Sequence, residues 1–426
     1  MNSASSRVAR AGDLNDVASA ARRLDVWIEE QDFRGWDPHD ALNSPVLRRL
    51  TLGSRIGGVL WLQLLKRFPI NLRPLLRVDK GYNPKGMGLF LASYIRKYRM
   101  TRDQVDLERI DSFAKWLVEH AEQGYSGTCW GYNFDWPNRA FFAPAGTPTV
   151  VNTSFIALAF VDLHRLLNND ELGGAQPSVS GPTALETARS SCDFILRDLH
   201  ALKPAADELC FSYTPLDRRL VHNASMLAAW LLAAVFRETG ESRLADAALA
   251  AARYTLRRQR PDGSWPYGDA ANDQWVDNFH TGFVLVALKR VADYLRTDEF
   301  DESLLCGYGF WKHNMFLAAG TPKYFPHKAS PVDVHSIAQA VLTFLEFQDS
   351  DPEAVDWALR VCRWGIQNMQ DPKGYFHYQI HRLYRVRIPY MRWGQAWMQR
   401  ALTEIMWWSA QSRTIALIPE NALCLD

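Results

Sequence analysis

The sequence predicts an all-α protein, an (α/α)6 toroid in which six helical hairpins close into a barrel with short aromatic segments at one rim. Three observations predict this fold. Apolar helical segments recur at intervals of 56 to 70 residues, amphipathic helical segments lie between them, and a short aromatic segment precedes most of the apolar ones. A repeat of this length indicates stacked supersecondary units, each unable to bury its hydrophobic face alone.

The apolar segments open on a small or polar residue and are rich in apolar and small side chains, which is typical of helices buried on most sides. They begin at Gly86, Asn152, His222, Asn278, His335 and Gly394. We expect these six helices to form the inner wall of the barrel.

The segments between them place charges on one face and apolar residues at i, i+3 and i+4, which predicts an outer ring of amphipathic helices. They are Val105–Glu122, Ala184–Ala201, Ser242–Gln259, Phe300–Phe316 and Pro352–Met369. An open helical solenoid is the alternative. The chain ends lack the polar capping repeats that a solenoid needs, so a closed ring is favoured.

A short aromatic segment stands between most outer and inner helices, often after a glycine-bearing turn such as Pro261–Ser264. These segments are Trp130–Tyr132, Phe211–Tyr213, Trp265–Tyr267, Tyr324–His327 and Phe376–Tyr378. Each predicted unit is therefore an outer helix, a turn, an aromatic segment and an inner helix.

The repeat divides the chain into three parts. Residues 1–79 do not show it and are predicted to be an N-terminal extension packed on the barrel, with an apolar helix inside Ser54–Val78. Residues 80–412 form the predicted toroid, and residues 413–426 a C-terminal tail.

Composition narrows the class of protein. The chain has 426 residues, a formal net charge of +1 and 47% hydrophobic residues, enough for a large core and too apolar for a disordered chain. A net charge near zero does not indicate a nucleic-acid partner. Met1–Gly12 lacks a signal-peptide core, and the longest apolar run, Met226–Phe236, is too short to span a bilayer, so we expect a cytoplasmic protein with no integral membrane segment.

No cofactor or metal site is expected. The six cysteines are scattered, and the chain has no Cys-x-x-Cys pair, phosphate-binding loop or nucleophile elbow. The 16 Trp, 15 Tyr and 21 Phe either fill a large core or line a sugar-binding cleft.

The inner helices all begin on one side of the predicted barrel, so their first residues and the segments before them converge on one funnel mouth. This rim is aromatic and biased toward basic groups, and the helix N-termini add partial positive charge. Aromatic rings stack on sugar faces, and Lys and Arg pair with carboxylates, so the predicted partner is an acidic oligosaccharide or polysaccharide. The predicted substrate-binding residues are Lys85, Trp130, Tyr132, Trp136, Arg139, Asn152, Tyr213, Arg218, Asn223, Trp265, Asn278, His327, Arg387, Arg392, Trp393 and Gln395.

Histidine and tyrosine side chains at the rim indicate proton-transfer chemistry. Abstracting a proton next to a carboxylate needs a base, an acid and a group that stabilises the enolate. The predicted catalytic residues are His222, Tyr267, His280, His335, Tyr378 and Tyr390. We therefore expect an enzyme acting on a uronic-acid polysaccharide, a C5-epimerase or a lyase.

Two alternatives stay open. A six-hairpin glycoside hydrolase would need two carboxyl groups across the scissile bond, and the rim offers Asp135, Asp277 and Asp333. A noncatalytic glycan-binding or scaffold protein of a polysaccharide synthesis complex would bind the same ligand without converting it.

Two resemblances support a toroid. The segment Gln259–Trp265 resembles the Gln-Trp repeat of the terpenoid cyclases and protein prenyltransferases, which implies their α/α toroid, although the cyclases' Asp-x-Asp-Asp motif is absent here. Most of the chain resembles the toroid proteins encoded in bacterial exopolysaccharide and capsule biosynthesis loci, through Arg67–Pro74, Trp130–Trp136 and Thr147–Thr153. That resemblance implies a role in making or tailoring a surface polysaccharide, and possible association with a synthesis complex.

Overall fold

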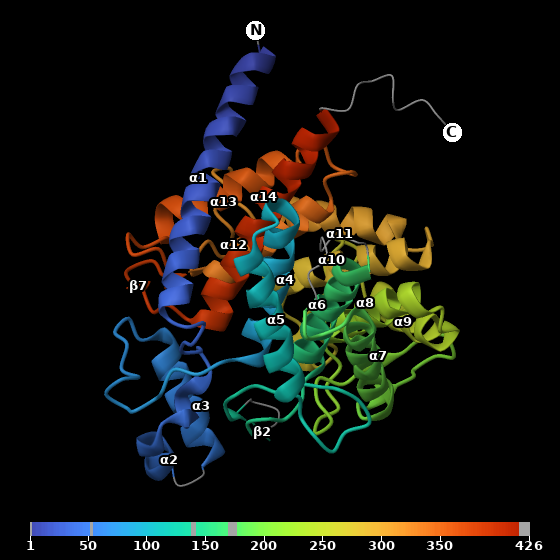
Figure 1. Cartoon of the computed structure of the whole chain (residues 1–426). Coiled ribbons are helices and arrows are strands. Elements are labelled where there is room, and N and C mark those ends of the chain that lie inside the picture. Colours follow the sequence, from blue (N-terminus) through green and yellow to red (C-terminus); the bar gives the residue numbers. More distant parts are fainter. Residues whose placement is uncertain (1, 52–53, 138–141, 169–176, 417–426) are drawn as a thin grey trace.

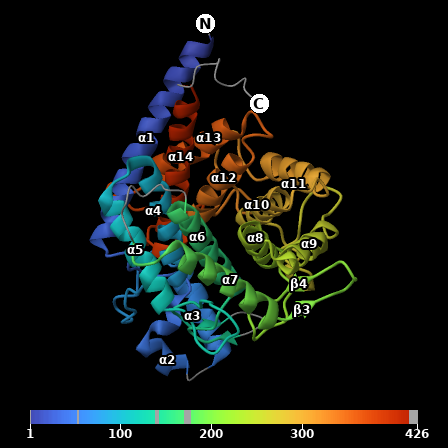
Figure 2. The same cartoon turned by 45° about the vertical axis from the view of Figure 1, so that its right-hand side comes forward.

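The computed structural model describes residues 2–51, 54–137, 142–168 and 177–416. Six helices form a closed inner ring in the described part of the chain, and each packs against the next, with the last packing against the first (Figures 1 and 2). They are α4 (Pro84–Thr101), α6 (Val150–Asn168), α8 (His222–Thr239), α10 (Asn278–Leu295), α12 (Val334–Glu346) and α14 (Trp397–Ala416), the last preceded by a π-helical turn, η3 (Met391–Ala396). Ring closure confirms the predicted toroid and excludes an open solenoid.

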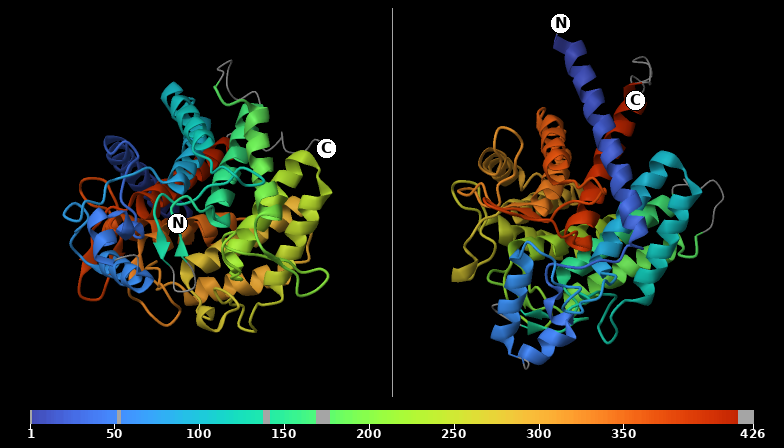
Figure 3. Two further views of the ribbon diagram at one scale, coloured as in Figure 1. Left: turned by 90° about the horizontal axis from the view of Figure 1, so that it is seen from below. Right: turned by 90° about the vertical axis from the view of Figure 1, so that its left-hand side faces the viewer.

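A second ring of amphipathic helices covers the first. Five of its members follow the inner helices in the chain, namely α5 (Gln104–Glu119), α7 (Gly181–Arg197), α9 (Ser242–Leu256), α11 (Asp301–Asn314) and α13 (Ala354–Met369). The sixth position belongs to α1 (Asn2–Glu30), which lies beside α14 and α13 (Figures 1 and 3). The last hairpin is therefore closed by the first helix of the chain.

The turn that follows each outer helix shows that α1 is equivalent to the other outer helices. Gln259 donates from Nε2 to the backbone carbonyl of Ser303 on α11, at 2.9 Å. Gln370 makes the corresponding bond to the carbonyl of Ala20 on α1, also at 2.9 Å. Gly374, at φ 105°, brings this turn against the α1 backbone with no room for a Cβ. The repeat thus continues from α13 to α1 in space, although the chain order is broken.

The tryptophans of the aromatic segments fix those segments to the preceding outer helix. The indole of Trp130 donates to the carbonyl of Leu117 on α5, at 2.8 Å. The indole of Trp265 donates to the carbonyl of Thr255 on α9, at 3.0 Å. Both tryptophans are buried, so the same bond sets the path of the chain from outer to inner helix in two repeats.

Short strands decorate the end of the ring where the inner helices begin. In antiparallel pairs, β1 (Trp136–Pro137) joins β2 (Phe142–Ala143), β3 (Ala201–Leu202) joins β4 (Cys210–Phe211), and β6 (Gln379–Ile380) joins both β5 (Val332–Asp333) and β7 (Arg385–Val386). A 3-10 turn, η2 (Ala271–Asp273), lies in the loop before α10.

Residues 31–79 form a separate layer over this end of the ring. They contain a 3-10 turn, η1 (Asp40–Asn43), and the helices α2 (Pro45–Thr51) and α3 (Arg55–Arg67), which stand at the lower end of the molecule in Figure 1. A small apolar cluster joins these elements, and α3 also contacts β1. The predicted N-terminal extension is therefore in two parts, α1 in the outer ring and this layer, while residues 417–426 of the predicted tail lie outside the described residues.

One helix in the described residues, α6, is long and apolar enough to cross a membrane by length and composition. Its most apolar window is 72% buried inside the protein. Its composition is explained by its place in the inner ring, where neighbouring helices cover it on most sides.

Candidate active site

A cavity of about 340 Å³ opens at the end of the ring where the inner helices begin. The segments before α6, α8, α10, α12 and α14 contribute to it, and the layer of residues 31–79 adds one wall. It is lined by His39, Lys66, Tyr132, Phe134, Trp136, Tyr213, Arg219, Tyr267, Asn272, Asp273, Trp275, Phe279, His280, Tyr324, Arg392 and Trp393. Its size and aromatic lining suit a sugar residue.

His280 is held by a buried aspartate. Asp277 is the N-cap of α10, and its Oδ1 accepts the backbone N–H of His280 at 2.9 Å. The other carboxylate oxygen, Oδ2, lies 2.8 Å from His280 Nδ1. Because Asp277 is 1% exposed and ionised carboxylates only accept, the pair favours the tautomer with hydrogen on Nδ1, which leaves Nε2 as a base. The stacked rings of Tyr267 and Trp275 pack against the imidazole from the side.

A second histidine enters the cavity from the layer of residues 31–79. His39 Nδ1 lies 3.2 Å from Asp37 Oδ1, and His39 Nε2 lies 3.4 Å from Lys66 Nζ. Burial, and then the positive charge of Lys66, lower the pKa of His39 to about 4. The imidazole is therefore neutral at physiological pH and accepts a hydrogen bond from the ammonium group.

Lys66 is the cation of the cavity that has no carboxylate partner. Within the described residues, the polar contact of its Nζ is His39, and the ring of Trp393 lies 5.3 Å from it. Burial lowers the pKa of Lys66, and attraction to the more distant Asp333 and Asp37 partly offsets this. A partly buried ammonium group without an ion pair is costly, which makes it a strong binding point for an incoming anion.

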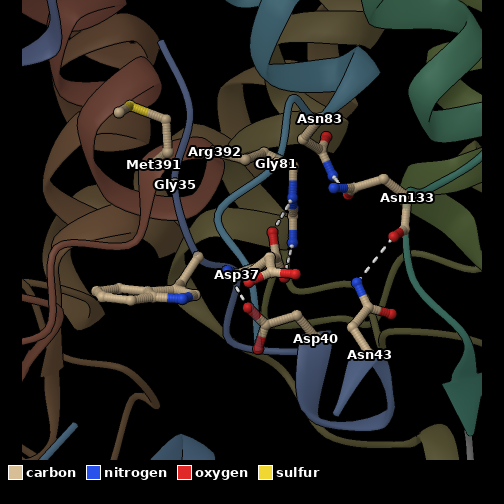
Figure 4. A pocket seen from close by; sticks show the side chains of 11 residues that line it. Gly35, Asp37, Asp40, Asn43, Gly81, Asn83, Asn133, Met391 and Arg392 are labelled. Carbon is tan, nitrogen blue, oxygen red and sulfur yellow. Dashed lines mark hydrogen bonds and ion pairs between the residues drawn. The ribbon is translucent and has the colours of Figure 1, made fainter. Parts of the chain in front are cut away.

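Arg392, by contrast, is neutralised within the protein. Its guanidinium donates to both carboxylate oxygens of Asp37, at 2.6 and 2.8 Å, as Figure 4 shows. Burial opposes ionisation of Asp37, but Arg392 and His39 outweigh it and hold the pKa of that carboxyl well below its ordinary value. The same region is tied to α4 and the loop before α6 by the bond between Asn83 and Asn133 (Figure 4).

Replacing Arg392 by Met should lower the free energy of unfolding by roughly 3–5 kcal/mol, because it leaves the Asp37 carboxylate buried without its cation. Urea denaturation measures the loss. The double variant Arg392→Met with Asp37→Asn removes both charges and should recover part of it. A double variant that is no more stable than the single one would contradict this account.

The neutral His39 predicts acid sensitivity. An unfolded histidine binds a proton near pH 6.5, whereas the folded His39 does so only near pH 4. As the pH falls, the unfolded state therefore takes up the proton first. The free energy of unfolding is highest above pH 6.5 and decreases as the pH falls to about 4, by roughly 3 kcal/mol for this group. Chemical denaturation at pH 7 and pH 4.5 measures how much the free energy of unfolding decreases between the two. The decrease should be smaller for His39→Gln than for the unmodified chain, and equal decreases would contradict a neutral His39.

Four tyrosines supply hydroxyl groups to the cavity. Burial raises the pKa of Tyr132, Tyr213, Tyr267 and Tyr324 above the ordinary value. Each hydroxyl therefore stays protonated at physiological pH and can donate to a sugar oxygen or return a proton to carbon.

Carboxylates are scarce at the cavity surface and already engaged. Among the described lining residues the carboxylate is Asp273, and both of its oxygens accept from Nη2 of Arg219. Asp135 accepts from Arg48 at 2.7 Å. Asp333 accepts from Gln379 and from Trp393 while capping α12. The described residues thus do not present two free carboxyl groups across a bound sugar, as a glycoside hydrolase requires.

The structure brings part of the predicted site together. Seven predicted residues line the cavity: Tyr132, Trp136, Tyr213, Tyr267, His280, Arg392 and Trp393. Three others, Asn223, Trp265 and Asp277, line a small adjoining space that shares Tyr267 and His280 with it.

The remaining predicted residues lie elsewhere. Those that point into the protein interior are Lys85, Trp130, Asn152, His222, Asn278, His335, Tyr378, Tyr390 and Gln395, and those on the surface are Arg218, His327 and Arg387. Asp135 and Asp333 are engaged as described above, and Arg139 lies outside the described residues.

The interior residues have structural partners that explain their position. His222 Nε2 lies 3.1 Å from Asp269 Oδ1, outside the cavity. Gln395 bonds to both backbone groups of Phe376. His335 is packed below the cavity floor between the rings of Phe279 and Trp397.

Sequence reasoning did not find His39 and Lys66, because they lie before the repeat begins and no periodic signal marks them. Trp275 and Phe279 stand beside predicted residues and belong to the same converging segments. Within the described ranges, no group of three or more His, Cys, Asp or Glu side chains is arranged to hold a metal ion.

No protein-family model and no curated protein sequence matches the chain. Solved structures do match it along most of its length. Cellobiose 2-epimerase from Bacillus thermoamylovorans is 9% identical, with a TM-score of 0.59 over 78% of this chain and 90% of the other. A family 76 glycoside hydrolase, an α-mannanase from Bacteroides thetaiotaomicron, is 10% identical, with a TM-score of 0.57 over 80% and 89%. D-mannose isomerase is 10% identical, with a TM-score of 0.57 over 77% and 87%.

Identities this low show the fold alone. The neighbours are α/α toroids. The closed ring of helical hairpins in the described residues shows the same architecture without reference to them. The chain therefore has the six-hairpin toroid fold that sugar epimerases and family 76 glycoside hydrolases also have.

Proposed function

We propose that this chain is a carbohydrate-active enzyme that removes the proton from a carbon next to the carboxylate of an acidic sugar. The finer assignment is uronate C5 chemistry, either epimerisation or β-elimination. One observation carries the proposal. An aspartate-held histidine base and a partly buried lysine without a carboxylate partner face the same aromatic cavity.

The proposed roles follow from the contacts. His280 Nε2 takes the proton from C5, and the electron pair of the broken C–H bond moves into the carboxylate to give an enediolate. Asp277 stabilises the imidazolium that forms, through the 2.8 Å contact to Nδ1. Lys66 pairs with the sugar carboxylate and stabilises the charge that develops on it.

The two outcomes differ in the second step. For epimerisation, a tyrosine hydroxyl of the cavity returns a proton to the opposite face of C5. The tyrosinate then regains a proton from solvent, and the His280 imidazolium releases the abstracted proton to solvent. For β-elimination, the electron pair forms a C4–C5 double bond as the C4–O bond breaks, and the departing oxygen takes a proton from a tyrosine hydroxyl of the cavity. The tyrosinate then regains a proton from solvent, and the His280 imidazolium releases its proton to solvent. Both steps balance without a cofactor.

Structural neighbours named as a cellobiose 2-epimerase and a D-mannose isomerase support sugar proton-transfer chemistry. They also favour a second candidate, proton exchange at C2 of a reducing-end aldose, which uses the same kind of base. Hydrolysis is less supported, because the one carboxylate among the described lining residues, Asp273, is paired with Arg219.

The test is incubation with uronic-acid oligosaccharides in heavy water, followed by proton NMR and mass spectrometry. Deuterium at C5 indicates epimerisation, a new double bond indicates a lyase, and deuterium at C2 of the reducing end indicates the second candidate. Cleavage with added water would overturn the proposal in favour of a hydrolase. Binding with none of these changes would overturn it in favour of a glycan-binding or scaffold protein of a polysaccharide synthesis complex.

A further inference from the structure

Residues 41–78 have an unusual charge balance for this chain. The whole protein carries a formal net charge of +1, yet this stretch has no Asp or Glu. Its seven basic residues are Arg48, Arg49, Arg55, Lys66, Arg67, Arg73 and Arg77. The rest of the chain therefore carries a formal net charge of −6, so positive charge is concentrated in the stretch that contains α2 and α3, where Arg73 pairs with Asp40 and Arg48 with Asp135.

The same layer exposes apolar side chains. Of the 17 large hydrophobic residues that are exposed among those described, six lie between Pro45 and Arg77. They are Leu50, Ile56, Leu60, Leu64, Ile70 and Leu75, exposed by 64%, 74%, 66%, 47%, 64% and 79%. Single exposed leucines are ordinary, but a concentration of them in one small layer marks an interaction surface.

The inward and the solvent-facing sides of helix α3 carry different residues. Leu62 and Leu65 point inward to the small apolar cluster that joins the elements of the layer, and Lys66 reaches the cavity. Ile56, Leu60 and Leu64 follow one another at four-residue spacing, so they form a stripe on the opposite, solvent-facing side. The inward face alone accounts for packing, so the outer stripe needs another explanation.

Exposed basic residues lie on α3 and on the segments that pack with it. Arg67 is exposed at the end of α3, and Arg49 and Arg77 are exposed on the neighbouring segments. The layer stands at one end of the molecule, away from most of the outer helices (Figures 1 and 3). Nothing in the described chain covers the stripe, and no carboxylate within residues 41–78 would repel an anionic surface.

We propose that the outer face of α3 and the adjoining loops dock on an anionic phospholipid bilayer. An exposed apolar helix face with arginines at its edge is the pattern of an interfacial membrane-binding helix, in which apolar groups enter the headgroup region and cations pair with lipid phosphates. A bilayer fits better than a protein partner, because the exposed charged side chains of α2, α3 and the segment that follows to residue 78 are arginines, with no carboxylate among residues 41–78. Docking would hold the cavity wall formed by Lys66 close to the membrane surface. This inference stands independently of the proposed reaction.

The test uses the full chain and sedimentation with two kinds of vesicle, phosphatidylcholine alone and phosphatidylcholine mixed with phosphatidylglycerol. We expect binding to the mixed vesicles that weakens with added salt. Leu60→Glu should reduce the partition coefficient about tenfold or more, and Arg67→Glu should reduce it about fivefold or more. Leu305→Glu, on the outer helix α11, is the matched control, since Leu305 is 75% exposed and Leu60 66%, and it should bind as the unmodified chain does.

Several outcomes would overturn the proposal. These are no sedimentation with mixed vesicles, equal losses for Leu60→Glu and Leu305→Glu, or binding that ignores lipid charge. Formation of dimers or larger assemblies that Leu60→Glu abolishes, without vesicle binding, would assign the face to another copy of the chain instead. All three substituted side chains are exposed, so we expect each variant to fold, and far-ultraviolet circular dichroism checks this.

Discussion

The variant His280→Gln should lower the rate of proton exchange from the sugar carbon by roughly a hundred- to ten-thousand-fold. Glutamine fills the same space and still bonds to Asp277, but its amide has no basic nitrogen at the position of Nε2. The measurement is deuterium incorporation into a uronic-acid oligosaccharide in heavy water. The urea denaturation midpoint should change little, because the imidazole is partly exposed and not part of the core.

A matched histidine variant controls for general effects of the substitution. His327→Gln lies on the surface and outside the cavity, and it should exchange at the unmodified rate. The exchange rate of Asp277→Asn should lie between those of His280→Gln and His327→Gln. Asparagine can still cap α10, but it no longer holds the Nδ1–H tautomer or stabilises the imidazolium. Exchange by His280→Gln at the rate of His327→Gln would remove His280 from the mechanism.

The variant Lys66→Met should lower kcat/KM for an acidic sugar by roughly ten- to a hundredfold, since it removes one charge-assisted bond to the carboxylate. It should not lower the free energy of unfolding, because a partly buried ammonium group without a carboxylate partner is replaced by an apolar side chain of similar length. Steady-state kinetics and urea denaturation test the two halves of this expectation.

A carboxyl methyl-esterified oligosaccharide, which is neutral but keeps an acidic C5–H, distinguishes charge recognition from general damage to the cavity. This neutral substrate should be a poor one for the unmodified chain, and Lys66→Met should cause no further loss with it. Equal proportional losses on the acidic and the neutral substrate would show that Lys66 shapes the cavity rather than recognising the carboxylate.

The repeat was predictable because helix periodicity is a local property of the chain. The predicted inner helices at His222 and Asn278 begin at those residues in the structure, and the other four begin within a few residues of their predicted starts. The outer helices were found by their amphipathic pattern, with ends that differ by a few residues because helix termini are set by local capping.

The role of α1 was not predictable from repeat spacing. It has a pattern of its own, since Val17, Ala21, Leu24 and Ile28 are buried at helical spacing. It completes a hairpin with α14, nearly 400 positions away in the chain, so no interval along the sequence places it in the ring. Only packing in three dimensions assigns it to the sixth outer position.

The sequence by itself determined the class of fold, the order of inner and outer helices, and the end of the barrel where chemistry-bearing residues gather. The tertiary structure alone decided which of those residues face the cavity. His222 and His280 both stand at the start of an inner helix, yet His222 turns to Asp269 outside the cavity while His280 faces inward beside Tyr267. The physical reason is that a side chain's direction depends on contacts with segments distant in sequence, and the layer that supplies His39 and Lys66 meets the ring only when the whole chain has folded.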